Sequence, residues 1–254
     1  MSRRVAIVTG GASGIGLATC RRFVAQGWNV VSADLSHTPG DSALLADTRS
    51  IEVRTDVTDE GDIRRLREVA EEVFGRVDAV VTSAGTADNA SLRQTTPERF
   101  RRTLELNLVS TFTVVRAFVD LLAADDGGSV VTIASVSGLR GSVDRASYSA
   151  SKGGVIALTS QLAIELADEG IRVNCVAPGS TLTPLAQRAQ SPEMRSAILA
   201  SIPLHRYADP NEIAEVVTFV ASPAAGFVTG QTWTVDGGQS MGAGWSLPKD
   251  RHDN

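Results

Sequence analysis

Residues 5–26 read VAIVTGGASGIGLATCRRFVAQ, and this stretch decides the fold expected of the 254-residue chain. Val5–Thr9 is apolar and β-branched, which is typical of a strand buried on both faces. The glycine-rich segment Gly10–Gly16 follows, and a helical pattern then extends to Gln26. Glycines between a strand and a helix allow a tight turn and leave free N–H groups at the helix N-terminus. The context therefore predicts a pyrophosphate site, which glycines alone would indicate only weakly.

The next predicted strand, Asn29–Ala33, ends at Asp34. A carboxylate about 20 residues beyond a glycine loop can accept hydrogen bonds from the 2′-hydroxyl of an adenosine ribose, and it would repel a 2′-phosphate. No Lys or Arg stands at positions 12, 13, 35 or 36 to attract such a phosphate. These residues favour NAD(H) over NADP(H). Without the glycine loop, Asp34 would be interpreted as an ordinary helix or turn cap.

Apolar strands and amphipathic helices alternate along the whole chain, and no repeat or linker divides it. This pattern predicts one doubly wound, Rossmann-type α/β domain over residues 1–254, with a mainly parallel seven-stranded sheet and helices on both faces. Residues 181–203 are interrupted by prolines and are expected to form a substrate-covering insertion. The tail 239–254 is expected to be weakly ordered or to pack on a neighbouring subunit. Further elements are expected at these positions: strands at 51–55, 77–82, 128–133, 171–176 and just before Gly237, helices at 58–74, 97–124, 146–169 and 210–220, and an irregular segment at 35–50.

A second stretch, SVSGLRGSVDRASYSASK at 135–152, follows a predicted strand. On a helix, Tyr148 and Lys152 lie on one face, about 5–6 Å apart at Cβ. Only two of the 24 Lys and Arg residues are lysines, and Lys, unlike Arg, shifts its pKa readily. A neighbouring ammonium favours the phenolate and lowers the phenol pKa from its usual value of about 10. Taken alone, the pair indicates no more than a surface helix.

Three separate signals lie just beyond predicted strand ends: Gly10–Gly16, Asp34 and Ser135. In an open parallel sheet the ligand crevice lies at the carboxyl ends of the strands. Tyr148 and Lys152 follow Ser135 closely in the chain. This convergence favours a catalytic role for the pair over a surface helix.

Composition excludes several classes of partner. The net charge of −5 and the lack of a basic cluster with interleaved aromatics argue against nucleic acid. No apolar run approaches the roughly 20 residues of a membrane helix, and no signal peptide is expected. Cys20 and Cys175 stand in apolar contexts and are interpreted as buried thiols of a cytoplasmic protein. The histidines are isolated and are interpreted as incidental surface or loop residues, and no metal site is predicted; they are His37, His205 and His252.

Over about residues 4–238 these motifs resemble the classical short-chain dehydrogenase/reductase family. Thr9–Gly16 fits the family's TGxxxGxG loop, and Tyr148–Lys152 fits its YxASK motif, with Ser135 thirteen residues before the Tyr. Asn107 falls where the family has its fourth catalytic residue. Further matches are the pair Asp56-Val57, which resembles the family's adenine-contacting pair, and the signatures Pro178-Gly179 and Val235–Gly238.

One signature departs from the family pattern. Where the family commonly has Asn-Asn-Ala-Gly, this chain has Thr82–Gly85, reading Thr-Ser-Ala-Gly. Because Thr and Ser can also donate and accept hydrogen bonds, we expect altered local bonding rather than lost activity.

The resemblance implies that Tyr148 exchanges a proton with the substrate oxygen, and that Ser135 hydrogen-bonds this oxygen. Lys152 would lower the Tyr148 pKa and bind ribose hydroxyls. For Asn107 the family implies a water in a proton relay, and the residues alone equally allow a side chain that satisfies backbone groups at a helix irregularity. The implied cofactor-binding residues are Gly10, Ser13, Gly14, Ile15, Gly16, Asp34, Leu35, Asp56, Val57, Ser83, Ala84, Gly85, Tyr148, Lys152, Pro178, Gly179, Thr181 and Thr183.

The resemblance implies an NAD-dependent oxidoreductase that interconverts a secondary alcohol and a ketone. The alternatives are an NADPH-dependent 3-oxoacyl-acyl-carrier-protein reductase and a catalytically silent nucleotide-binding protein. A methyltransferase using the glycine loop would have no use for Tyr148 and Lys152. The family also implies a homotetramer that associates through the helices around 97–124 and 146–169.

The substrate is not identified by the sequence, but two features bear on it. Arg140 and Arg145 lie near Ser135 and can attract an anionic group, although solvated positions are favoured for both. The insertion is expected to present an apolar wall formed by Leu182, Leu185, Met194, Ile198 and Leu199.

Overall fold

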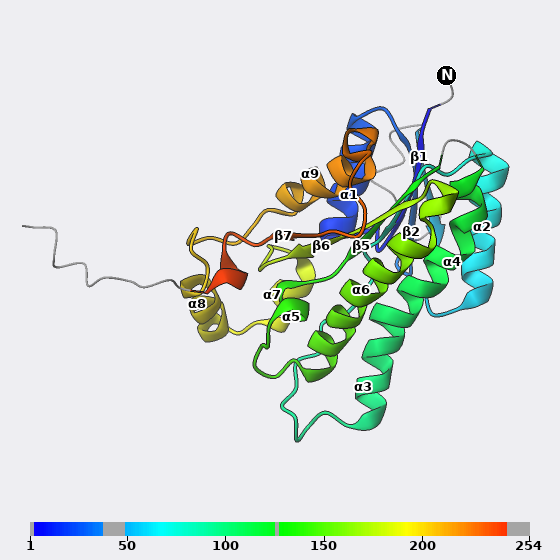
Figure 1. Ribbon diagram of the computed structural model, residues 1–254. Helices are drawn as coiled ribbons and strands as arrows, with labels where there is room; N and C mark the ends of the chain where they lie inside the picture. The colour runs from blue at the N-terminus through cyan, green and yellow to red at the C-terminus, as the bar shows by residue number, and fades with distance from the viewer. Residues whose placement is uncertain (1–2, 38–48, 125–126, 243–254) are drawn as a thin grey trace, which may run out of the picture.

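The computed structural model describes residues 3–37, 49–124 and 127–242. Within them seven parallel strands form one sheet in the order β3-β2-β1-β4-β5-β6-β7 (Figure 1). The predicted doubly wound α/β fold is confirmed, and the sheet is parallel throughout rather than mainly so. The strands are β1 (Val5–Thr9), β2 (Asn29–Asp34), β3 (Ser50–Arg54), β4 (Ala79–Thr82), β5 (Ser129–Ile133), β6 (Arg172–Pro178) and β7 (Thr232–Val235).

Helices cover both faces of the sheet, and each face has its own apolar core (Figure 1). On one face α1 and α9 pack beside each other, with Phe23 and Val217 in the core. On the other face α2, α4 and α6 enclose Leu66 and Phe118. The helices are α1 (Gly14–Ala25), α2 (Glu60–Phe74), α3 (Pro97–Leu104), α4 (Ser110–Ala123), α5 (Val136–Leu139), α6 (Ala146–Glu165), α7 (Pro184–Ala189), α8 (Pro192–Ala200) and α9 (Pro210–Ala221).

The long helical region expected at 97–124 contains an irregularity. Between α3 and α4 a π-helical turn, η1 (Glu105–Val109), carries Asn107. Such turns occur often at functional sites. Leu108 of η1 packs on Gly154 of α6 so closely that a Cβ on Gly154 would lie 2.6 Å from it. The small residues of α6 therefore bring η1 against the helix that carries Tyr148 and Lys152.

The same region, Pro97–Ala123, is the one helix of the described residues that is long and apolar enough to cross a membrane by length and composition. The sequence analysis expected no run of this kind. Core helices of proteins that do not span a membrane meet the same criterion. In this structure α4 contacts α2, β4 and β5. The region accordingly serves here as part of the layer that covers the sheet.

Several element boundaries shift by one or two residues from prediction. Helix α2 begins at Glu60 rather than at 58, because the Asp59 side chain accepts hydrogen bonds from the N–H groups of Gly61 and Asp62. Strand β4 begins at Ala79 rather than at 77. Residues 181–203 form α7 and α8, and each helix begins at a proline, as the interrupted pattern indicated.

One sequence interpretation was wrong. His37 is not an incidental surface residue: it is buried, its Nδ1 lies 3.0 Å from Glu52 Oε2, and its Nε2 lies 2.8 Å from Ser32 Oγ. At the start of the tail Gln239 is buried, and its Oε1 accepts a hydrogen bond from Ser180 N at 3.0 Å; for the tail as a whole the expectation stays a prediction. Most of segment 35–50 and of tail 239–254 lies outside the described residues.

Candidate active site

The glycine loop folds back over the end of β1 and packs against the end of β4. Gly10 has φ +69°, and a Cβ there would lie 2.8 Å from the backbone of Ala84. A Cβ at Gly16 would lie 2.1 Å from the Gly10 carbonyl oxygen. Both positions therefore require glycine, for backbone conformation at Gly10 and for close approach at Gly16. The turn brings the N-terminus of α1 to the carboxyl edge of the sheet, as the sequence predicted.

A cavity of about 840 Å³ extends along this edge. Its wall includes every residue that the sequence analysis assigned to the cofactor, from Gly10 to Thr183. It also includes Ser135, Tyr148 and Lys152, so the structure brings three of the four predicted catalytic residues to the same cavity. Strand order reverses between β1 and β4, so this is the switch point where open α/β sheets bind ligands.

One end of the cavity is acidic. Asp34 Oδ2 accepts a hydrogen bond from Ala12 N at 3.1 Å, and Oδ1 accepts from Ser36 N at 2.9 Å. The Asp34 carboxylate therefore ties β2 to the glycine loop. Asp56 Oδ1 accepts from the Thr58 hydroxyl at 2.7 Å and from Thr58 N at 2.9 Å, and these bonds hold the pKa of Asp56 below its ordinary value.

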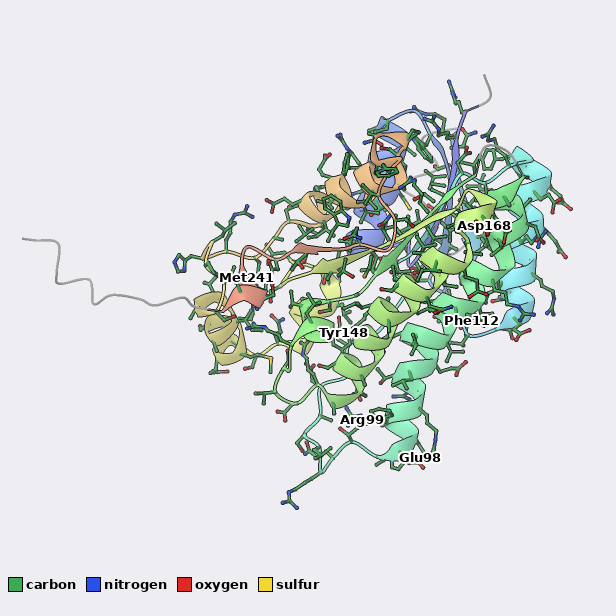
Figure 2. All side chains as sticks on the ribbon, in the orientation of Figure 1. Glu98, Arg99, Phe112, Tyr148, Asp168 and Met241 are labelled. Carbon is green, nitrogen blue, oxygen red and sulfur yellow. The ribbon has the colours of Figure 1, made fainter. Side chains whose placement is uncertain are left out.

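The other end holds Ser135, Tyr148 and Lys152. Ser135 caps α5, and its Oγ accepts a hydrogen bond from Ser137 N at 3.1 Å. Tyr148 and Lys152 belong to the N-terminal part of α6, and Figure 2 labels Tyr148 there. Lys152 Nζ lies 5.9 Å from the Tyr148 ring centroid and donates a 2.7 Å hydrogen bond to the Ile133 carbonyl at the end of β5. The predicted helical spacing of Tyr and Lys is thus present in the structure.

Burial shifts the pKa of both titrating groups. It lowers the pKa of Lys152 to about 8 and raises the pKa of the Tyr148 phenol above its ordinary value. For Tyr148 this rise is opposed first by interaction with the Ser135 hydroxyl and then by the charge of Arg145. The groups that favour the phenolate here are therefore Ser135 and Arg145. The sequence argument gave that role to Lys152, and for this residue the role stays a prediction.

Asn107 is the one predicted catalytic residue that does not line the cavity. It is buried, and its Oδ1 accepts a hydrogen bond from Thr86 N at 2.8 Å. Its Nδ2 donates to the Thr86 carbonyl and to Ser151 Oγ, each at 3.0 Å. From the π-helical turn, its amide thus satisfies the backbone groups of Thr86 and ties the loop after β4 to α6. The water relay stays a prediction.

For the departing signature, Thr82–Gly85, the difference in hydrogen bonding from the family pattern stays a prediction. Among the described residues, the buried Thr82 hydroxyl has no hydrogen-bond partner. The backbone of the loop is instead held from β1, because Ala84 N donates to Thr9 Oγ1 at 3.2 Å. A Cβ at Gly85 would lie 3.0 Å from Asn107 Oδ1, so a side chain there would press on the Asn107 amide.

The insertion contributes part of the expected apolar wall. Leu185, Met194 and Ile198 line the cavity, whereas Leu182 and Leu199 do not. Sequence reasoning missed polar residues of the wall, including Ser142, Gln190 and Gln239. Neither glutamine belongs to a motif. Gln190 reaches the cavity from the insertion, and Gln239 reaches it from the segment after β7, where its Oε1 accepts from Ser180 N. Arg140 and Arg145 also line the wall, although solvated positions were favoured.

The thiol interpretation is confirmed, since Cys20 and Cys175 are free and buried. No group of His, Cys, Asp and Glu that could hold a metal ion occurs in the described part of the chain.

Comparison with known proteins agrees with this geometry. The family model described as enoyl-(acyl carrier protein) reductase matches residues 10–240. Cis-4-hydroxycyclohexanecarboxylate dehydrogenase of Sinomonas cyclohexanicum is 39% identical over 241 residues, covering 93% of this chain and 96% of that protein. A 3-oxoacyl-[acyl-carrier-protein] reductase of Thermotoga maritima is 36% identical, covering 92% and 97%. The crystal structure of levodione reductase superposes with a TM-score of 0.88 at 31% identity, covering 95% and 99% of the two chains.

The chain belongs to the short-chain dehydrogenase/reductase family. This is a family of oxidoreductases that use a nicotinamide cofactor, and its named relatives here include dehydrogenases and reductases.

Proposed function

We propose that this protein is an NAD(H)-dependent oxidoreductase that interconverts a secondary alcohol and a ketone, with Tyr148 as general acid and base. One observation carries the proposal: Ser135, Tyr148 and Lys152 line the same cavity as the glycine loop. A catalytically silent protein has no requirement for that set at one end of a nucleotide cavity. General acid–base help from such a phenol is worth roughly 10²–10⁴ in rate.

The residues present fit a dinucleotide. Ser13, the N-cap of α1, makes no hydrogen bond from its side chain to the first turn, so N–H groups there are available to a phosphate. A Cβ at Gly14 would lie 3.2 Å from Thr183, so the loop forms a cradle that a side chain would fill. When bound, the nicotinamide supplies or accepts the hydride.

The roles of this chain's residues follow from their positions. The Tyr148 phenol removes the proton of the alcohol or returns it to the ketone, and Ser135 donates a hydrogen bond to the same substrate oxygen. The Lys152 ammonium donates to the Ile133 carbonyl and lies 5.9 Å from the Tyr148 ring centroid, and in our proposal its charge adds to the effect of Ser135 and Arg145 in favouring the phenolate. Asn107 holds the loop after β4 against α6, beside a proton relay through water.

The choice of NAD over NADP rests on Asp34. Its carboxylate lines the cavity at the end of β2, where it can accept hydrogen bonds from a ribose and repels a 2′-phosphate. Arg54 stands beside Asp34 in the register of β2 and β3, but it is not part of the cavity wall. Among the residues that the structure describes, the cavity wall therefore presents no cation at this end.

The experiment is a panel of secondary alcohols, including cis-4-hydroxycyclohexanecarboxylate and cyclohexanol, each with NAD⁺ and with NADP⁺. We expect reduction of NAD⁺, monitored at 340 nm, with at least one alcohol. Failure of every alcohol, and of the matching ketones with NADH, would contradict the proposal.

A second candidate is an NADPH-dependent 3-oxoacyl-acyl-carrier-protein reductase, favoured by 36% identity to a protein of that name. Reduction of a 3-oxoacyl thioester with NADPH, faster than any alcohol oxidation with NAD⁺, would select this candidate.

We further propose a cytoplasmic homotetramer. Free buried thiols suit a reducing compartment. Exposed apolar side chains lie on η1, α4 and α6, namely Val109, Phe112 and Ile164, and Figure 2 shows Phe112 on the outer side of α4. Contact between copies would remove this apolar surface from water. Light scattering at micromolar concentration should give four times the chain mass, and a clean monomer would contradict the assembly.

A further inference from the structure

Arg145 stands at the substrate end of the cavity without an acidic partner. It is the N-cap residue of α6, and its side chain is partly buried in the cavity wall. Its guanidinium carbon lies 5.2 Å from the centroid of the Tyr148 ring. Within the described ranges, no ion pair or hydrogen bond engages its guanidinium. Its donors are therefore close to the reacting phenol and not neutralised.

The backbone of Arg145 is held on both sides. It forms a parallel bridge with Ala90, and Ala90 N donates to the Asp144 carbonyl at 2.9 Å. Its own carbonyl accepts from Ser149 N at 2.7 Å in the first turn of α6. With the ring of Tyr148 under the guanidinium, the side chain is positioned rather than free to move into solvent. This differs from an ordinary surface arginine.

Nearby carboxylates do not cancel the charge. Asp88, close to the start of α6, accepts from Arg99 Nε at 3.0 Å and from the Ser147 hydroxyl at 3.3 Å, so its charge is already paired with that of Arg99. Asp144 is exposed and is not part of the cavity wall. Glu193, on α8, is exposed and also lies outside the wall.

The described cavity wall is divided by charge. Its acidic residues, Asp34 and Asp56, follow β2 and β3 at the end assigned to the adenosine. Its cationic residues are Arg140, Arg145 and Lys152, all at the Tyr148 end. The charge of Arg145 also acts on Tyr207, whose hydroxyl donates to Gln190 of the wall at 2.9 Å. Arg145 therefore stands between the reacting phenol and the insertion, where the part of a substrate remote from its hydroxyl would lie.

We infer that Arg145 forms an anion subsite, and that the substrate is a secondary alcohol carrying a carboxylate or sulfonate away from the reacting carbon. This inference rests on the proposed function and deepens it. The guanidinium fork matches a carboxylate bidentately, which a neutral substrate cannot exploit. Arg140, exposed and further along the same wall, adds to the positive potential. The apolar side chains Met194 and Ile198 cover the carbon skeleton between the two ends.

The test compares binding of cyclohexanecarboxylate and of its neutral isostere, cyclohexanecarboxamide, by calorimetry. Each is titrated into the wild type, Arg145→Met, Arg145→Lys and the control Arg21→Met, whose arginine is exposed on α1 and outside the cavity wall. All titrations are made on the protein alone and with saturating NADH. The preference for the anion is thus decided whether or not the cofactor binds. Cyclohexanesulfonate is the third probe and separates the two kinds of anion.

We expect the wild type and Arg21→Met to bind the carboxylate about ten- to a hundredfold more tightly than the amide. In Arg145→Met the carboxylate and the amide should bind within about twofold of each other. Arg145→Lys should keep part of the preference for the carboxylate. A wild type without preference, or a preference that survives in Arg145→Met, would overturn the inference. Equal weakening of both probes would overturn it too, since Arg145 would then act only through Tyr148. Absence of NADH and NADPH binding would instead count against the proposed function.

Discussion

The chemistry of single residues is set by how each is buried. Lys152 is buried at the carboxyl edge of the sheet, where its ammonium donates a hydrogen bond to the Ile133 carbonyl. This burial lowers the pKa of Lys152 to about 8. Tyr148 beside it is partly buried, and desolvation disfavours its charged form as well, so the pKa of its phenol is raised. A phenol that must give up a proton therefore depends on the hydroxyl of Ser135 and on the positive charges around it.

The buried Lys152 makes stability depend on pH. Between about pH 8 and 10.5 the unfolded chain keeps the lysine proton while the folded protein has lost it, so the free energy of unfolding rises with pH in this window. Lys152→Met should therefore be more stable than the wild type below pH 8, by on the order of 1–3 kcal/mol, and this gain should shrink towards pH 10. Urea unfolding of both proteins across that range measures it. A difference that is constant with pH would show that the lysine is not desolvated.

The carboxylate of Asp34 should decide cofactor choice. Asp34→Ala removes the repulsion of a 2′-phosphate and the acceptor for the ribose, so the ratio of kcat/KM for NAD⁺ over NADP⁺ should fall at least tenfold. Initial rates with both cofactors give this ratio. Asp168→Ala is the control: Asp168 is exposed in η2 (Ala167–Glu169), outside the cavity wall (Figure 2). A wild type that already prefers NADP⁺ would show that the electrostatic argument is wrong.

At the scale of elements, the site depends on close contact between short and long helices. Gly138 of α5 lies so close to α6 that a Cβ there would be 2.7 Å from the Lys152 carbonyl carbon. Since Ser135 is the N-cap residue of α5, this contact fixes the serine hydroxyl relative to the lysine. The π-helical turn η1 acts similarly, because it directs Asn107 towards Thr86 and Ser151.

This packing predicts opposite effects of two neighbouring glycine substitutions. In Gly138→Ala the added Cβ meets backbone atoms of Lys152 and Gly153 that cannot move away. The variant should therefore be less stable by about 1–3 kcal/mol. Its kcat should also fall, because Ser135 would be displaced. Gly153→Ala, on α6, meets only an ordinary contact of 3.5 Å and should be neutral or stabilise by up to about 1 kcal/mol. Thermal unfolding measures both. Equal stability of the two variants would show that α5 and α6 are not closely packed.

For the whole molecule, the sequence was sufficient for the fold, the glycine turn and the placement of Ser135, Tyr148 and Lys152. These depend on local patterns and on one topological rule, that parallel strands share a carboxyl edge. His37 was misread because its partners, Ser32 and Glu52, lie on two different strands whose register is not visible in the chain. The sequence placed Arg145 near Ser135 but favoured a solvated position for it, since a residue before a helix has no periodicity that reveals what its side chain faces.

The most direct test of the account replaces Tyr148 by Phe and measures turnover and cofactor binding together. With an alcohol that the wild type oxidises, kcat of Tyr148→Phe should fall by roughly 10²–10⁴. The dissociation constant of NADH, from fluorescence titration, should stay within about threefold of the wild-type value. A variant that kept near-wild-type kcat would contradict the claim that this phenol, with Ser135 and Lys152 around it, performs the proton transfer.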